Sequence, residues 1–392
     1  IITIPQKNTS ALTVLILVGA GSHYEEKQIN GVSHFLEHLL FKGTKKRPSQ
    51  VDIAEPLDRV GGVFNAFTSE EYTGFFAKVD GKHFELALDI LSDIYLNSKL
   101  DPQDIEKERG VIIEEINMYY DHPSSYIQTL WKKLLYGDQP AGWDIAGTKK
   151  SVLNISREAL KNYMKTQYVS KNTVICVAGN LTDSKKAISK IRKYFVNIKD
   201  TDKIIKRKKV TEKQQKPMVL LQKRKTDQTH ICLGTRGYNL FHPKKYAFEL
   251  LGDILGGMMS SRLFIKVREE MGAAYYITTS TSLHIDNGFL VTQAGIDNKK
   301  IKEVISVILQ EYKRIREEKI SQKELKKAKD HLIGKMSLAL ESSDAQASFY
   351  GLQEILEKKI LTPKQICDKI NKVTPSEILK VAQDIFRPDK LN

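Results

Sequence analysis

The spacing of apolar residues in the first part of the chain changes repeatedly between two patterns. Ala11 to Val18 is apolar throughout except for Thr13, which is typical of a buried strand. Gly31 to Phe41 instead carries its apolar residues at helical spacing and predicts a helix that stops near Gly43. The same criteria predict a strand pair over 63–79, helices over 84–96, from Pro102 onward and over 184–194, and a strand over 172–179.

Residues 199–217 interrupt this pattern. The stretch has few apolar residues and carries eight lysines and arginines, which predicts an exposed linker between two domains, 1–198 and 218–392. A basic tail that binds an acidic partner is the alternative. The basic residues are Lys199, Lys203, Lys206, Arg207, Lys208, Lys209, Lys213 and Lys216.

The second half of the chain repeats the apolar pattern of the first. With an offset of 220 residues, Leu100 matches Ile320 and Ile105 matches Leu325. A weaker match joins 155–171 to 373–390, and only the first of these copies runs on into a strand, so we expect a further strand beyond Asn392. The repeat predicts two copies of one fold.

The composition excludes several classes of protein. The chain has 41% hydrophobic and 28% charged residues, unlike a disordered or membrane protein, and its longest apolar run is half a membrane span. The net charge is +15, but no helix combines a sustained basic face with aromatic residues, so we expect no nucleic-acid partner. No signal segment is visible, and the default location is the cytoplasm, with an organelle matrix or the periplasm left open.

The three cysteines are Cys176, Cys232 and Cys367. They are far apart, odd in number and set among apolar residues, without a C-x-x-C pair. This argues against a disulfide framework and against zinc bound by cysteine. We expect buried free thiols.

The predicted helix at 31–41 carries the candidate chemistry. His34 and His38 are four residues apart, so both imidazoles lie on one face and can share a metal ion. Glu37 is close enough to act as a base on water at that metal without being a ligand. The H-x-x-E-H order is a signature of inverted zinc peptidases. The alternative is a pair of histidines without a metal.

Zinc hydrolysis requires a further ligand, and the helix that begins at Pro102 offers four glutamates. Glu106 and Glu114 are expected to face solvent. Glu108 and Glu115 flank the apolar stripe and lie seven residues apart, two turns along one face. This suits one metal ligand and one carboxylate that orients a histidine. The spacing alone does not decide which is which.

The segment from Gly31 to Thr44 resembles the signature of the pitrilysin family, which includes insulin-degrading enzyme, mitochondrial processing peptidase and bacterial peptidases of about this length. The resemblance implies that one zinc ion (Zn2+) per chain is held by His34, His38 and Glu115, which follows His38 by 77 residues. It also implies that Glu108 orients a ligand and that Glu37 is the general base.

Two further segments carry the resemblance. Gly61 to Thr68 is similar to the family's edge strand, which implies that Asn65, Ala66 and Phe67 hold the substrate backbone. An ordinary hairpin is the alternative. Arg268 and Tyr275 resemble the family's arginine–tyrosine pair. This implies that Arg268 binds a substrate carbonyl and that the Tyr275 hydroxyl helps to stabilise the oxyanion. Without the family, they are a surface charge and a half-buried ring.

Together these features predict a zinc-dependent endopeptidase. The fold class is α+β, with two homologous domains, each a mostly antiparallel sheet packed against helices, facing each other across a chamber. At the 220-residue offset Lys335 replaces Glu115 and Ala328 replaces Glu108, so we expect no metal in the second domain.

The expected partners are a short or unfolded peptide substrate and a second chain, as a homodimer or a heterodimer with a related chain. One alternative is a processing peptidase that removes targeting presequences. Another is a structural or inactive partner subunit of a peptidase or of a respiratory complex.

Overall fold

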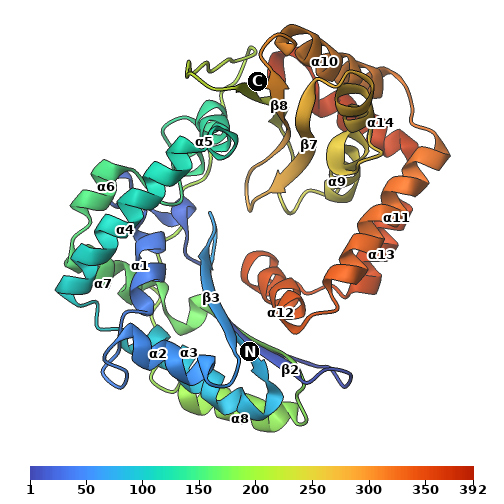
Figure 1. Cartoon of the computed structure of the whole chain (residues 1–392). Helices are drawn as coiled ribbons and strands as arrows, with labels where there is room; N and C mark the ends of the chain where they lie inside the picture. Colours follow the sequence, from blue (N-terminus) through green and yellow to red (C-terminus); the bar gives the residue numbers. More distant parts are fainter. The chain divides into compact units, whose positions relative to one another are not determined.

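A computed structural model describes residues 1–392 (Figure 1). The chain forms two compact units, and each of them takes segments from both halves of the sequence. Unit 1 comprises Ile1–Met118, Trp143–Lys208 and Ala339–Leu361, and unit 2 comprises Tyr119–Gly142, Lys209–Leu338 and Thr362–Asn392.

Unit 1 is built on a five-stranded sheet with the order β1-β5-β2-β4-β3. Only β1 and β5 pair in parallel, and all other neighbours are antiparallel, as the sequence predicts. β3 forms one edge of this sheet. The strands are β1 (Ile2–Pro5), β2 (Ala11–Val18), β3 (Val63–Thr68), β4 (Thr73–Asp80) and β5 (Thr173–Gly179).

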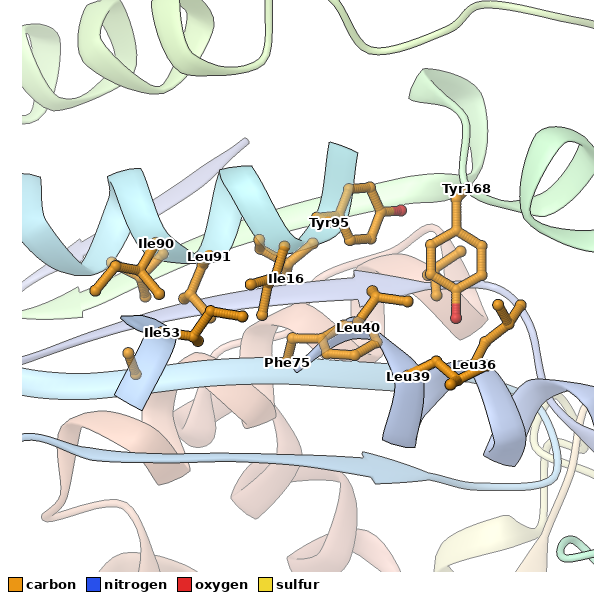
Figure 2. Packing of buried hydrophobic residues seen from close by; sticks show 14 of the residues in the cluster. Ile16, Leu36, Leu39, Leu40, Ile53, Phe75, Ile90, Leu91, Tyr95 and Tyr168 are labelled. Carbon is orange, nitrogen blue, oxygen red and sulfur yellow. The ribbon is translucent and has the colours of Figure 1, made fainter. Parts of the chain in front are cut away.

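Helices cover both faces of this sheet, which explains the continuous apolar run of β2. Leu12, Val14 and Ile16 point to a core formed with α1 and α3, whereas Leu15 and Leu17 point to the opposite face. Figure 2 shows the first core, where side chains of α1, α3, β2 and β4 meet. The helices of unit 1 are α1 (Val32–Leu40), α2 (Gln50–Asp58), α3 (Phe84–Asn97), α4 (Pro102–Asp121, whose last three residues belong to unit 2), α6 (Lys149–Asn154), α7 (Arg157–Gln167), α8 (Ser184–Tyr194) and α12 (Ser343–Leu352).

Helix α12 covers the opposite face of the sheet, although it comes from the second half of the sequence. Ala347 packs with Leu15, Leu17 and Cys176 in one buried cluster. At the start of the helix the Ser343 hydroxyl lies 2.8 Å from that of Thr13, and Lys78 donates to Asp344 at 2.6 Å. The second half of the chain therefore completes the core of unit 1.

Unit 2 contains an antiparallel sheet of three strands, β6-β8-β7, with its own buried core. A bulge interrupts β7 between Ala274 and Tyr276, so that Tyr275 has no partner in the register. The strands are β6 (Gln228–Arg236), β7 (Ala274–Leu283) and β8 (Gly288–Asp297), and the helices are α5 (Pro123–Tyr136), α9 (Lys245–Gly252), α10 (Ile301–Glu317), α11 (Gln322–Ala339), α13 (Pro363–Lys372) and α14 (Pro375–Ile385).

The two units repeat the same helix pair, as the 220-residue offset predicts. α3 and α4 correspond to α10 and α11. Leu100 and Ile320 are both buried just before the second helix of each pair. The predicted boundaries at 198 and 218 differ from the units in two segments, 119–142 and 339–361, because α5 packs on β6 and α12 packs on β2 and β5. Such exchanges depend on packing between distant segments and leave no local mark in the sequence.

The remaining sequence predictions concern thiols and membrane spans. All three cysteines are free, but only Cys176 is buried, while Cys232 and Cys367 are half-buried. The prediction of burial was therefore right for one thiol and too strong for the other two. None of the helices combines the length and the apolar composition needed to cross a bilayer.

Candidate metal centre

Helix α1, which carries the H-x-x-E-H residues, is anchored at its N-terminus by a buried carboxylate. Gly31 precedes the helix with φ +98°, and a Cβ there would lie 2.7 Å from the Ala146 carbonyl oxygen, so this position requires glycine. Glu25 accepts from the Gly31 amide at 2.7 Å and from the Ser33 amide at 2.9 Å. These bonds satisfy amides that the first turn of a helix leaves unpaired.

Helix α4 lies against α1 and supplies the glutamates. Arg109 donates to the Ile155 carbonyl at 3.0 Å, and its guanidinium lies 5.4 Å from the centroid of the Phe35 ring on α1. Glu108 is buried on the apolar side of α4, whereas Glu106 and Glu114 are exposed, as the apolar stripe predicts. The packing therefore turns one side of α4 toward the histidines.

His34, His38 and Glu115 converge in unit 1. Oε2 of Glu115 lies 3.5 Å from Nε2 of His34 and 3.5 Å from Nε2 of His38. One ligand atom from each residue lies within 4.8 Å of the others. The donors of a tetrahedral zinc site, with bonds of about 2.0–2.1 Å, stand roughly 3.4 Å apart. Two imidazole nitrogens and a carboxylate oxygen at these separations fit a zinc ion with one coordination position left open.

Glu108 occupies the other side of His38. Its Oε2 lies 3.1 Å from Nδ1 of His38, and its Oε1 accepts from Nζ of Lys42 at 2.7 Å. The two glutamates left open by the spacing thus occupy different places, with Glu115 at the Nε2 atoms and Glu108 at Nδ1. A carboxylate on Nδ1 fixes the tautomer and the ring orientation of a histidine that binds metal through Nε2.

The electrostatics of the cluster differ between the two histidines. Burial lowers the pKa of His34, and the charge of Glu115 offsets this only in part. Burial also acts to lower the pKa of His38, but the contacts with Glu115 and Glu108 outweigh it and raise the pKa. The hydrogen bond with His38 lowers the pKa of Glu115 against the effect of burial. The surroundings therefore shift the two histidines in opposite directions and place the pKa of His38 above that of His34.

Glu37 lies between the two histidines in the sequence and accepts a hydrogen bond from a residue of the sheet. Its Oε2 accepts a hydrogen bond of 2.7 Å from the hydroxyl of Thr68, the last residue of β3. The predicted base is thus beside the histidines on α1 and has a fixed partner on a neighbouring element. Thr68 was not among the residues predicted for the site.

The three residues predicted to hold substrate lie on β3, the edge strand of unit 1. Asn65 is exposed, and its Oδ1 accepts from the Ala66 amide at 2.8 Å, while Ala66 and Phe67 are half-buried. β3 pairs with β4 on one side only. An unpaired strand edge can accept an extended peptide as an added strand.

Arg268 and Tyr275 lie together in unit 2. The Arg268 guanidinium is 6.0 Å from the centroid of the Tyr275 ring and 4.9 Å from that of Phe264. Tyr275 is the bulged residue of β7, and 76% of its surface is exposed, far more than for a half-buried ring. Bulges redirect a side chain and are common beside active sites.

Comparisons with known proteins bear on this geometry. Residues 1–149 match the family model described as Insulinase (Peptidase family M16), and residues 154–332 match the model described as Peptidase M16 inactive domain. YmxG of Bacillus subtilis, named as an uncharacterized zinc protease, is 35% identical over 379 residues, which cover 97% of this chain and 91% of YmxG. The chain belongs to peptidase family M16.

Solved structures from other organisms share this fold. A protease from Helicobacter pylori superposes with a TM-score of 0.93 at 23% identity, covering 99% of this chain and 94% of that one. A chain from the complex III2 structure of Candida albicans gives a TM-score of 0.84 at 18% identity, covering 99% and 91%. At these identities the superpositions establish the shared fold and not the activity of this chain.

Three residues of this M16 centre were not predicted from the sequence. Lys42 lies four residues after His38, at the spacing of one helical turn, and that spacing could have indicated its contact with Glu108. Glu25 lies before the start of α1, and Thr68 lies on β3, far from α1 in the sequence. Neither of these two leaves a periodic signal.

Proposed function

We propose that this M16 protein is a zinc endopeptidase that hydrolyses short or unfolded peptides. The convergence of the His34 and His38 Nε2 atoms on Oε2 of Glu115, with Glu37 on the same helix, is the observation that carries the proposal. Bound there, zinc supplies Lewis-acid polarisation of a carbonyl and lowers the pKa of a coordinated water. The enclosed chamber around the substrate stays a prediction.

The residues of the chain divide the remaining work. His34, His38 and Glu115 hold the metal, and Glu108 fixes the ring of His38 through Nδ1. Glu37 takes a proton from the attacking water and later gives it to the leaving amine. Asn65, Ala66 and Phe67 bind the peptide backbone along the free edge of β3.

Unit 2 contributes a second set of groups under this proposal. Arg268 binds a carbonyl of the substrate through its charged donors, and the Tyr275 hydroxyl stabilises the oxyanion. The exposure of Tyr275 supports this role, because its hydroxyl can reach a ligand without breaking a buried contact. The pairing of two chains, identical or related, stays a prediction that light scattering of the purified protein can test.

Zinc content and cleavage of an unstructured peptide library test the proposal together. The wild type is expected to bind one zinc per chain and to cleave, whereas Glu37→Gln is expected to keep zinc and lose about 10²–10⁴-fold in kcat. Glu114→Gln, an exposed glutamate on α4, is the matched control and should behave like the wild type. Wild-type protein without stoichiometric zinc, or equal cleavage by Glu37→Gln, contradicts the proposal.

Two alternatives remain open to the same experiment. A presequence-processing peptidase would cleave basic targeting peptides at a single position rather than many unstructured peptides. A chain of a complex III structure shares this fold. A structural or inactive subunit would not cleave any peptide. The complete set of histidines and glutamates favours the enzyme, because a structural role does not require them.

A further inference from the structure

Thr68 reaches the base because of its place on β3. Side chains alternate between the two faces of a strand. Phe64 and Ala66 pack against the core that contains α1, so Thr68, two residues further on, faces α1 as well. Its Oγ1 donates to Oε2 of Glu37 at 2.7 Å, a short hydrogen bond of the kind that carboxylates accept from hydroxyls.

The backbone that carries the Thr68 hydroxyl is firmly held. Thr68 is opposite Thr73 in the β3–β4 register, and the Ser69 amide donates to the Tyr72 carbonyl at 2.8 Å to close the hairpin. The buried hydroxyl of Thr73 in turn donates to the Ala20 carbonyl at 2.9 Å. Thr68 is therefore a fixed donor rather than one on a free loop.

The Thr68 hydroxyl restricts the side chain of Glu37 but engages only one of its two carboxylate oxygens. Glu37 is half-buried, and its flexible side chain would otherwise sample several rotamers. The Thr68 hydroxyl engages Oε2 alone, which leaves Oε1 to accept a proton. The bond also joins the base to the strand whose preceding residues, 65–67, are the proposed peptide-binding edge.

We propose that Thr68 is the positioning residue of Glu37 and holds its carboxylate in the orientation used for proton transfer. This inference rests on the proposed zinc-peptidase function. It assigns Thr68 no contact with the metal and no direct chemistry. The loss of its hydroxyl should therefore reduce the rate of turnover and leave metal binding and substrate affinity in place.

The test compares Thr68→Val, which keeps the β-branched shape, with Thr68→Ser, which keeps the hydroxyl. We expect kcat of Thr68→Val to fall about tenfold to hundredfold, part of the effect of a general base, with KM within about twofold of the wild type. Thr68→Ser should stay within about threefold of the wild type in kcat. Zinc affinity and the visible spectrum of the cobalt-substituted protein should be the same for all three proteins, and thermal unfolding verifies that each is folded.

Each other outcome has a definite meaning. An unchanged kcat in Thr68→Val, an equal loss in Thr68→Ser, or a rise in KM alone overturns the positioning role. A shifted cobalt spectrum or weaker zinc binding in Thr68→Val also overturns it, because Thr68 would then act on the metal site. If Thr68→Val does not fold, kcat of Thr68→Ser and Thr68→Ala decides, and equal values overturn the proposal. Failure of the wild type to cleave any peptide instead contradicts the proposed function itself, and this inference falls with it.

Discussion

Oε2 of Glu108 lies 3.1 Å from Nδ1 of His38, on the side of the ring opposite to the nitrogen that faces Glu115. Glu108→Gln keeps the shape but removes the charge that holds this ring. We expect zinc affinity to fall about 10- to 100-fold, as for other carboxylates that orient a metal-binding histidine. Competition with a fluorescent chelator measures the change. Glu106→Gln, an exposed position on the same helix, should bind zinc like the wild type.

Lys42 should contribute to the same site through Glu108. Its Nζ donates to Oε1 of Glu108 at 2.7 Å, so Lys42→Met leaves a buried carboxylate with one partner fewer. We expect a loss of zinc affinity of about threefold to tenfold, smaller than for Glu108→Gln, since the contact is one step further from the metal. Lys42→Arg should restore most of the affinity. An equal loss in Lys45→Met, an exposed lysine nearby, would show that overall charge is responsible.

Zinc affinity should depend on pH in a direction set by His38. The contacts with Glu115 and Glu108 raise its pKa although burial opposes them, so in the metal-free protein His38 keeps a proton at pH values above its usual pKa of about 6.5. Zinc must displace that proton. Affinity should therefore fall about tenfold per pH unit below the raised pKa and level off above it. His34, whose pKa is lowered, should add no proton near neutral pH. Calorimetry in buffers of different ionisation enthalpy counts the protons released.

The capping carboxylate of α1 should matter for stability. Glu25 is buried and accepts from the Gly31 and Ser33 amides and from the Asn30 side chain at 2.9 Å. Glu25→Ala leaves buried donors without acceptors, which costs about 1–3 kcal/mol in the free energy of unfolding. Urea unfolding of the metal-free protein measures this. Its exposed neighbour, changed as Glu26→Ala, should cost less than about 0.5 kcal/mol.

Tyr275 and its neighbour on β7 provide a matched pair of variants. Tyr275→Phe removes a hydroxyl that is exposed at the bulge, so we expect kcat to fall by about 10²-fold or more with unchanged stability and zinc content. The Tyr276 hydroxyl instead lies 2.9 Å from Nδ1 of His230. Tyr276→Phe should therefore affect stability rather than kcat. A similar loss of kcat in both variants would contradict the special role of Tyr275.

The sequence predicts most elements because their signals are local. The observed bounds of β2 and α8 coincide with the predicted 11–18 and 184–194, since a continuous apolar run marks the strand and Asp183 caps the helix. The pairing of His34 with His38 follows from helical spacing in the same way. The spacing did not decide which of Glu115 and Glu108 is the expected metal ligand, and only the family resemblance assigned the two roles. The structure places the two carboxylates at different nitrogens of His38.

Other features require the folded chain. The bond from Thr68 to Glu37 depends on the register of a hairpin and on where that hairpin meets α1. The bulge at Tyr275 depends on pairing with β8, and no residue type in the segment demands it. The return of α12 to unit 1 joins Ser343 to Thr13 across 330 residues of sequence. Periodicity describes each segment by itself and says nothing about such distant partners.

The position of α12 has a consequence for biosynthesis. The proposed zinc ligands lie before residue 120, yet the second face of the unit 1 sheet is covered by a helix that ends at Leu352. A nascent chain that has emerged only as far as residue 198 carries every proposed metal ligand and leaves Leu15, Leu17 and Cys176 open to solvent. Assembly of unit 1 on the ribosome must therefore wait until most of unit 2 has also been translated. A fragment cut within residues 199–217 keeps the proposed zinc ligands without a finished core.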